Sequence, residues 1–333
     1  MKRIIGIGNA LTDVLVNLSD DEVIRRFGFT RGGMHLVDSQ VQKSISEDLA
    51  ELPHTLSMGG SAANTIRALA KLGCETGFVG KVGSDRTGDY YVRALENLRV
   101  RATILRGDSH SGRCVSLVSN DGERTMVTYL GAAVELTADE LSPEVFDGFD
   151  CLYIEGFLVQ DRDLIEGAVK MAKMCGLKIA IDLACANVVA QNYDFLRGLV
   201  EAHIDILFAN EQEAEAFTHE KEPLAAIDHL SRFCDTVVVK VGPKGAYIWY
   251  DGEITHVGIM DEARRIDSTG AGDFYAAGFL YGLSQGMTIR QCGTIGAVTA
   301  GRVIEVVGTT FSEEVWDDIT GLVKRVRAEQ YLL

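Results

Sequence analysis

The sequence predicts an α/β protein with a doubly wound, mostly parallel sheet flanked by helices and a small β-sheet lid. From residue 150 onward, short apolar runs alternate with helical stretches, which is the pattern of parallel strands joined by crossover helices. Residues 102–130 instead alternate in short strands around Asn120-Asp121-Gly122, a hairpin signal. The 333 residues contain no repeat or long linker, so 1–333 is expected to form a single domain. The later strands are expected near 151–155, 178–182, 205–209, 236–241 and 246–249.

Composition limits the partners that the chain can bind. A net charge of −16 argues against a nucleic-acid surface, but a few amides and cations can still bind a phosphate locally. No apolar stretch reaches the length of a membrane span, and the apolar run near Met1 is too short for a signal peptide. The seven cysteines form no CxxC pair, so we expect no disulfide framework, no zinc site and a reducing, cytoplasmic location.

The first strand is expected at 3–8, and polar side chains follow it. Gly6-Ile7-Gly8 resembles the start of a dinucleotide fingerprint, but Leu11 stands at the third glycine and the next residues alternate like a strand. A dinucleotide site is therefore disfavoured. Asn9 and Asp13 are either ligands of a substrate or an ordinary turn residue and a solvated carboxylate.

Gly59-Gly60 opens a predicted helix that ends before Gly73. The apolar positions after Gly60 follow helical spacing. Two glycines at a helix start allow a ligand to approach the backbone, and Asn64 in the first turn offers both a donor and an acceptor. A tight turn followed by a polar first turn explains this segment equally well.

The strand at 78–83 and the helix at 88–98 precede the hairpin region of the lid, which is expected to come from roughly 10–38 and 101–131. This small, mostly antiparallel sheet can close over a site. Arg124 on its hairpin is either a surface cation or a guanidinium that reaches phosphates on closure. The exposed edge of the lid leaves a monomer and a homodimer through the lid both open.

Two further strand ends carry candidate ligands. Asn210 and Glu213, one helical turn apart, either hold Mg²⁺ through water or form a helix capping box, and both can be true together. Lys240, Gly242 and Gly245 form a turn that either passes along a nucleotide or is a tight hairpin.

The strongest motif is Asp267-Ser268-Thr269-Gly270-Ala271-Gly272-Asp273, directly before a helix of small apolar residues. The first amides of a helix have no internal partner and the helix dipole makes this end positive, so the backbone amides of Gly270, Ala271, Gly272 and Asp273 predict an anion site. Asp273 beside an anion makes chemical sense if it accepts a hydroxyl proton while the amides hold a phosphoryl group in transfer. A simple helix cap is the alternative.

Ligands of open parallel sheets bind beyond the carboxyl ends of the strands, so all these candidates are expected at one edge. Together they resemble the ribokinase-like (PfkB) carbohydrate kinase family, over essentially the whole chain and in the family's order. The matching motifs are its C-terminal signature at Asp267–Asp273, its N-terminal one at Gly59-Gly60 with Asn64, its Mg²⁺-associated motif at Asn210-x-x-Glu213 and its nucleotide turn at Lys240-x-Gly242-x-x-Gly245.

Within this family the chain is most similar to the adenosine kinases, through residues 8–13, 59–64 and 204–211. The resemblance implies a ribokinase-like fold, ATP as phosphate donor, Mg²⁺, and Asp273 as general base. A monovalent cation such as K⁺ would lie near Asp267 and Thr269, as in some relatives.

The resemblance also implies a substrate site. Asp13 would bind ribose hydroxyls, and the residues beside it or lining the nucleoside pocket would be Asn9, Leu11, Leu36, Gly59, Gly60, Asn64 and Phe157. Arg124 would reach the phosphates from the lid. Asn187 departs from the apolar or aromatic partner expected for a purine, and Lys240 stands where the family often has threonine. These departures bear on the base that is recognised and not on phosphoryl transfer.

The sequence therefore predicts an ATP-dependent kinase of a nucleoside 5′-hydroxyl, with adenosine as the first candidate. The alternative is a sugar kinase for ribose, fructose or 2-keto-3-deoxygluconate, because Asp13 and Asn64 would serve a bare sugar equally well. A non-catalytic nucleoside sensor is a third hypothesis, which the intact motifs disfavour.

Overall fold

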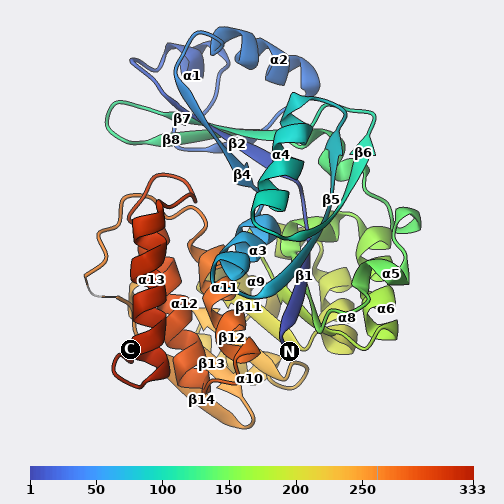
Figure 1. Ribbon diagram of the computed structural model, residues 1–333, viewed down its shortest axis with the longest axis vertical. Coiled ribbons are helices and arrows are strands. Elements are labelled where there is room, and N and C mark those ends of the chain that lie inside the picture. The colour runs from blue at the N-terminus through green and yellow to red at the C-terminus, as the bar shows by residue number, and fades with distance from the viewer. Residues whose placement is uncertain (261) are drawn as a thin grey trace.

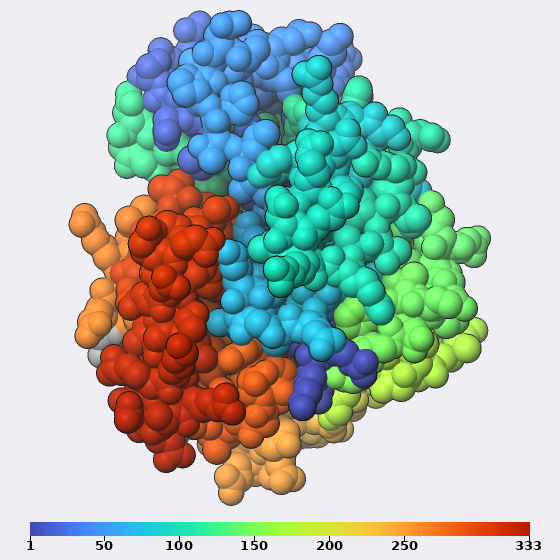
Figure 2. Space-filling view, in the orientation of Figure 1, coloured from blue at the N-terminus to red at the C-terminus, as the bar shows by residue number. Residues whose placement is uncertain are grey.

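The structure is a computed structural model that describes residues 1–260 and 262–333, and it confirms the predicted α/β fold class (Figure 1). Within these residues the strands form two sheets, one of nine strands and one of five. Figure 1 shows the smaller sheet above a body in which helices flank the larger sheet. In the space-filling view, the N-terminal residues of the smaller sheet and its helices form the upper lobe of the molecule (Figure 2).

The nine-stranded sheet has the order β14-β13-β12-β11-β10-β9-β1-β5-β6. Its strands are parallel except at one edge, where β13 pairs antiparallel with both β12 and β14. In chain order its strands are β1 (Arg3–Ile7), β5 (Glu75–Gly83), β6 (Arg101–Gly107), β9 (Cys151–Glu155), β10 (Lys178–Asp182), β11 (Ile206–Asn210), β12 (Thr236–Lys240), β13 (Ala246–Tyr250) and β14 (Glu253–Val257).

Helices cover both faces of this sheet, which is why its central strands are apolar on both sides. One face packs against α3 (Ser61–Lys71), α4 (Arg86–Asn97), α11 (Ala271–Ser284), α12 (Ile289–Val303) and α13 (Glu313–Arg327). The other packs against α5 (Pro143–Phe146), α6 (Arg162–Met174), α7 (Ala186–Gln191), α8 (Tyr193–His203), α9 (Glu211–Thr218) and α10 (Pro223–Leu230). Short 3₁₀ helices lie at η1 (Gly131–Glu135), η2 (Ala138–Glu140), η3 (Gly156–Gln160) and η4 (Gly242–Lys244).

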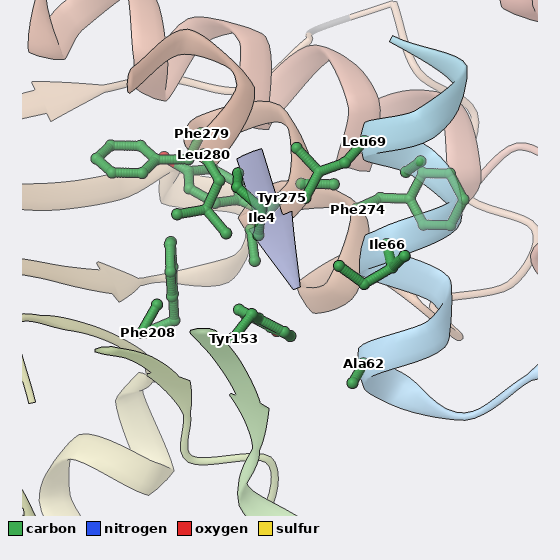
Figure 3. Close-up of a cluster of buried hydrophobic side chains, with 14 of the residues drawn as sticks. Ile4, Ala62, Ile66, Leu69, Tyr153, Phe208, Phe274, Tyr275, Phe279 and Leu280 are labelled. Carbon is green, nitrogen blue, oxygen red and sulfur yellow. The ribbon is translucent and has the colours of Figure 1, made fainter. Parts of the chain in front are cut away.

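The core fixes the relative position of α3 and α11. Figure 3 shows Ile66 and Leu69 of α3 facing Phe274 and Tyr275 of α11, with strand residues beneath them. These side chains are almost completely buried. Because both helices pack on the same core, their N-termini meet at one place beside the carboxyl ends of the strands.

The smaller sheet, called the lid sheet below, has the order β3-β8-β7-β2-β4. Its strands are β2 (Leu11–Asn17), β3 (Met34–Leu36), β4 (His54–Gly59), β7 (Gly112–Val118) and β8 (Arg124–Tyr129). An apolar cluster joins one face of it to α1 (Glu22–Arg26) and α2 (Ser39–Asp48). The opposite face carries Asp13, Cys114 and Thr128 and looks toward the body.

The predicted lid needs two corrections. Residues 101–107 were expected in it, but they form β6, parallel to β5, because the β5–α4–β6 segment is a crossover unit of the main sheet. Residues 54–59 were not expected in it, but they form β4, antiparallel to β2. The lid sheet is also mixed, since β2–β7 and β3–β8 are parallel pairs.

No helix among the described residues is long and apolar enough to cross a bilayer. After β1 the chain continues directly into β2 and opens no helix. The backbone therefore lacks the strand–turn–helix arrangement of a dinucleotide site at this position.

Candidate active site

A cavity of about 1370 Å³ lies between the lid sheet and the carboxyl ends of the main strands. It brings together most of the residues that the sequence pointed to. Those lining it are Asn9, Leu11, Asp13, Leu36, Gly60, Asn64, Phe157, Asn187, Asn210, Glu213, Lys240, Gly242, Gly245, Thr269, Gly270, Ala271, Gly272 and Asp273. Gly59, Arg124 and Asp267 lie behind this lining and contact residues that form it or adjoin it.

Two helices begin at the floor of the cavity, and each follows a glycine with positive φ. Gly60 precedes α3 with φ of 93°, and a Cβ there would lie 2.1 Å from the Asn9 carbonyl oxygen. Gly270 precedes α11 with φ of 76°. The amides of Gly272 and Asp273 have no acceptor among the described residues, whereas the amide of Ala271 donates to the Ser268 carbonyl (3.2 Å). Of the expected anion-binding amides, those of Gly272 and Asp273 are therefore free.

The Asp273 carboxylate is held by donors from α3. Ser61 Oγ donates to Asp273 Oδ1 (2.6 Å), and Asn64 Nδ2 donates to Oδ2 (2.9 Å). Burial raises the pKa of Asp273 to about 7, although these two hydrogen bonds lower it, while the charges of Asp182 and Glu155 raise it further. A carboxylate with a pKa near neutrality is suited to accept a proton.

Asn64 is fixed in turn by a buried arginine. Arg67 Nη2 donates to Asn64 Oδ1 (3.0 Å), to the Thr309 carbonyl (2.6 Å) and to Thr309 Oγ1 (2.7 Å). The Thr309 hydroxyl also donates to Asn64 Oδ1 (3.2 Å). Since the amide oxygen of Asn64 faces two donors, its nitrogen must face Asp273. Asn64 uses its amide oxygen and one N–H for protein partners and lines the cavity, so its second N–H leaves the expected contact with a substrate as a prediction.

Two acceptors in the cavity have no protein donor. Asn9 gives its backbone amide and its Nδ2 to Glu155 Oε1 (2.8 and 2.7 Å), which leaves Asn9 Oδ1 buried without a partner among the described residues. Asp13 accepts no hydrogen bond from the described residues. Burial raises the pKa of Asp13 to about 6, although the charges of Arg67 and Arg124 lower it. Both groups can accept hydrogen bonds from a ligand.

Arg124 ties the lid sheet to the signature loop. Its guanidinium forms an ion pair with Asp267 and also donates to Thr269 Oγ1 (2.8 Å) and Ser116 Oγ (2.8 Å). Asp267 Oδ1 accepts from Thr269 and Oδ2 accepts from the amide of Gly308. The carboxylate expected near a monovalent cation is thus already neutralised by an arginine, so its contacts do not fit such an ion.

Asn210 and Glu213 form a complete capping box at the start of α9. Asn210 Nδ2 and the Asn210 amide donate to the two carboxylate oxygens of Glu213 (2.6 and 2.7 Å), and the Glu213 amide donates to Asn210 Oδ1 (2.9 Å). Burial and the charge of Asp182 raise the pKa of Glu213. Every side-chain oxygen of the pair thus has a protein donor, which does not fit direct ligation of Mg²⁺. Contact with the ion through water stays a prediction.

Lys240 reaches the same region from the end of β12. Its Nζ donates to Asp182 Oδ2 (2.7 Å) in a largely buried ion pair. Burial alone would lower the pKa of Lys240, but Asp182 and Glu213 outweigh it, so the pKa is raised and the amine stays charged. The described residues contain no cluster of three or more acidic, histidine or cysteine side chains that could hold a metal ion.

Sequence reasoning missed the roles of several residues around these groups. Glu155 and Asp182 each end a strand, as the predicted ligands do, and this position was the available signal. Arg67 is the one charged residue among the buried side chains of α3, three residues after Asn64. Nothing in the sequence places Thr309 beside Asn64, because 245 residues separate them.

The doubly wound fold, the paired helix starts and the carboxylate beside free amides are the features expected above from the resemblance to the ribokinase-like family. The family model described as pfkB family carbohydrate kinase matches residues 41–316. The chain therefore belongs to the pfkB family of carbohydrate kinases.

Relatives within this family carry different substrate names. A guanosine-inosine kinase of Escherichia coli (strain K12) is 29% identical over 259 residues, which cover 74% of this chain and 59% of that protein. An adenosine kinase of Saccharomyces cerevisiae is 26% identical over 330 residues, covering 92% and 96%. The crystal structure of adenosine kinase from Sinorhizobium meliloti has a TM-score of 0.85 and 30% identity, covering 96% of this chain and 99% of that one. This chain is thus similar to nucleoside kinases at modest identity.

Proposed function

We propose that the chain transfers the γ-phosphoryl group of ATP to the 5′-hydroxyl of a nucleoside, with adenosine as the preferred substrate. The observation that carries the proposal is the pair of unpartnered acceptors within the described residues, Asp13 and Asn9 Oδ1, in the same cavity as Asp273. Two acceptors suit the neighbouring hydroxyls of a ribose, which are hydrogen-bond donors. The similarity to nucleoside kinases supports the same substrate class.

The cavity also offers an apolar wall for a base. Leu11, Leu36 and Phe157 line it, and Leu36 is 66% exposed. Burying such exposed apolar side chains against a flat aromatic base is favourable. An apolar wall has no comparable use for a bare sugar, which favours a nucleoside over the sugar alternative.

In the proposed reaction Asp273 accepts the proton of the 5′-hydroxyl. The hydroxyl oxygen forms a bond to the γ-phosphorus as the bond from that phosphorus to the β,γ-bridging oxygen breaks, and ADP leaves. The amides of Gly272 and Asp273 and the positive end of α11 stabilise the charge on the transferring group. Mg²⁺ bound to the nucleotide would neutralise phosphate charge. Asn210 and Glu213 do not fit as its direct ligands.

A sugar kinase remains the second candidate, because Asp13 and Asn9 would accept hydrogen bonds from any vicinal diol. The test is phosphate transfer from ATP–Mg²⁺ to adenosine, inosine, guanosine, ribose, fructose and 2-keto-3-deoxygluconate. The highest kcat/KM is expected for adenosine. A preference for a bare sugar would replace the nucleoside assignment, and saturable binding without transfer to any acceptor would indicate a sensor.

Two leucines on the lid sheet allow a separate test for binding of the base. Leu36 lines the cavity, whereas Leu56 is 43% exposed on β4 and does not line it. Leu36→Ala should raise KM for adenosine about tenfold, the value of one to two kcal/mol of lost apolar contact. Leu56→Ala should leave it unchanged. Equal effects in both variants would contradict a base site on the lid.

We also propose a reducing, cytoplasmic location, with which the seven free cysteines of the described structure agree. Helices α1 and α2 cover one face of the lid sheet, but its edge strands β3 and β4 stay available for pairing with a second copy. Light scattering on the purified chain distinguishes a monomer from a homodimer through the lid.

A further inference from the structure

The amine of Lys240 has hydrogen-bonding capacity that the protein does not use. A lysine ammonium has three N–H donors, and within the described residues Lys240 Nζ has one acceptor, Asp182 Oδ2, at 2.7 Å. The lysine side chain is 16% exposed and the Asp182 side chain 6% exposed. Both residues line the cavity. Two donors of a largely buried cation are therefore available to a ligand.

The amine lies at the N-terminus of α11. A Cβ placed on Gly272 would lie 3.1 Å from Lys240 Nζ and 3.9 Å from Asp182 Oδ2. A glycine at position 272 therefore lets the ion pair approach the helix backbone directly. Gly272 does not have a positive φ, so its backbone conformation does not require glycine. The close approach of the Lys240 amine is what favours glycine at this position.

The helix terminus by itself opposes a cation at this position. The N-terminus of a helix carries partial positive charge, which favours anions and disfavours a lysine. Asp182 and Glu213 outweigh this repulsion and keep the amine charged, so its two remaining N–H groups can be given to an anion. An anion bound between the amine and the helix would contact Lys240 and the free amides of Gly272 and Asp273 together.

We propose that Lys240 is a catalytic residue whose amine contacts the γ-phosphoryl group during transfer, and that Asp182 is a positioning residue for that amine. The inference deepens the proposed function and rests on it. As the γ-phosphorus leaves the β,γ-bridging oxygen of ATP and bonds to the substrate oxygen, Lys240 compensates charge on the non-bridging oxygens. The hydroxyl proton still passes to Asp273, and Lys240 gains and loses no proton.

A purely structural ion pair would make a different prediction. Removing one partner of a buried pair leaves the other charge uncompensated and destabilises the fold, whereas replacing both partners with neutral residues often restores stability. If Lys240 serves only to neutralise Asp182, the double replacement should restore activity along with stability. If Lys240 contacts phosphate, it should restore stability alone.

The experiment compares Lys240→Met, the double variant Lys240→Met/Asp182→Asn and the control Lys244→Met. Lys244 lies four residues away in the same turn, exposed and outside the cavity lining. The readouts are the melting temperature, binding of inorganic tripolyphosphate and of ATP by calorimetry, and kcat and KM. Tripolyphosphate binding needs neither an acceptor substrate nor a metal.

The double variant is expected to melt near the wild-type temperature, to bind tripolyphosphate at least tenfold more weakly, and to have kcat lowered by about 10²- to 10³-fold, as for loss of one charge-stabilising donor. KM for the nucleoside should stay near the wild-type value, and the Lys244 variant should match wild type throughout. Wild-type tripolyphosphate affinity and kcat in the double variant would overturn the inference.

Failure of the proposed function would look different. If the wild-type chain phosphorylates no acceptor, the nucleoside kinase proposal fails, while the binding measurements still decide the role of Lys240. Weaker tripolyphosphate binding in the double variant, with unchanged binding in the Lys244 variant, would then still support a phosphate contact. Equal binding in all variants would overturn it.

Discussion

At the scale of single residues, the proposed proton transfer depends on Asp273 and on the two side chains that donate hydrogen bonds to it. A buried carboxylate resists ionisation, while hydrogen bonds from Ser61 and Asn64 favour the charged form. The balance leaves the pKa of Asp273 at about 7. Such a group is ionised in a useful fraction at neutral pH and still basic enough to take a proton.

Replacing Asp273 with asparagine should abolish this proton transfer. The side chain keeps its size, so nucleoside binding should survive and KM should change little. We expect kcat to fall by about 10²- to 10⁴-fold, the usual contribution of a general base. Steady-state kinetics and a ligand-induced thermal shift measure the two quantities separately. Nearly full activity in Asp273→Asn would remove Asp273 from the mechanism.

The pH dependence of catalysis should report the same carboxylate. Asp273 must be ionised to accept a proton, so kcat/KM should rise with pH up to about 7 and level off above it. Ser61→Ala removes a donor that stabilises the charged form, which raises the pKa of Asp273. The rising limb should therefore move to higher pH by about one unit.

The control for this shift lies in the same helix. Thr65 Oγ1 donates to the backbone carbonyl of Asp273 (3.1 Å) and not to its carboxylate. Thr65→Val should therefore leave the position of the pH limb unchanged, whatever it does to stability. An identical shift in the Ser61 and Thr65 variants would mean that the limb reports general loosening of the site.

At the scale of elements, the start of α3 shows how backbone shape builds the site. Gly60 has a φ of 93°, and a Cβ at this position would lie 2.1 Å from the carbonyl oxygen of Asn9. This close approach joins the end of β1 to the start of α3. Asn9 and Ser61, which flank this approach, both line the cavity.

Gly60→Ala should therefore disturb both folding and catalysis. Gly73, at the other end of α3, provides a matched control, since its φ is 95° but no described atom lies within 4 Å of the position that a methyl group would take there. Gly73→Ala should cost about 1 kcal/mol in the free energy of unfolding, from backbone strain alone. Gly60→Ala should cost more and lower kcat/KM at least tenfold. Equal costs, with kcat/KM intact, would show that the contact with Asn9 is unimportant.

The same scale shows what the sequence could and could not predict. Gly59-Gly60 and the Gly270–Asp273 turn were recognisable because glycine spacing and an apolar helix are local features, and both helix starts lie where expected. The exchange of 54–59 and 101–107 between the sheets was missed, because strand pairing depends on partners far away in the chain.

Side-chain partners were harder to predict than backbone motifs. The Asn210–Glu213 pair was recognised, but the sequence could not separate a metal site from the capping box that the structure contains. The pairing of Lys240 with Asp182 joins the ends of two strands 58 residues apart in the chain. Only the order of strands in the sheet brings these two residues together, and local sequence patterns do not determine that order.

At the scale of the whole molecule, the cavity between the lid sheet and the body contains several buried carboxyl groups whose ionised forms are disfavoured. Asp13, Glu155 and Asp273 all have pKa values raised by burial. A carboxyl group whose pKa is higher in the folded than in the unfolded state contributes stability at low pH and loses it as pH rises through the folded pKa. The ligand-free cavity should therefore destabilise the protein above neutrality, which a bound ligand can offset.

Asp13 offers the cleanest test of this cost, because it accepts no hydrogen bond from the described residues. The pKa of Asp13 is about 6 in the folded chain against an ordinary value of 3.8. The protonated carboxyl group therefore contributes its full share to folding stability below about pH 4, and this share is lost by about pH 7. Asp13→Asn should match wild type at pH 4 and be more stable at pH 8 by about 1–3 kcal/mol in the free energy of unfolding.

The control is a carboxyl group whose pKa is shifted in the opposite direction. Asp121, on the exposed turn of the lid hairpin, has a pKa lowered by its hydrogen bond to Arg31, so its ionised form favours the folded state. Asp121→Asn should therefore give no gain in stability at pH 8. Urea unfolding of both variants at pH 4 and pH 8 makes the comparison. If Asp13→Asn is no more stable than wild type at pH 8, the Asp13 carboxylate is already neutralised within the folded chain, and the assignment of this group as an unpaired acceptor for a substrate diol is wrong.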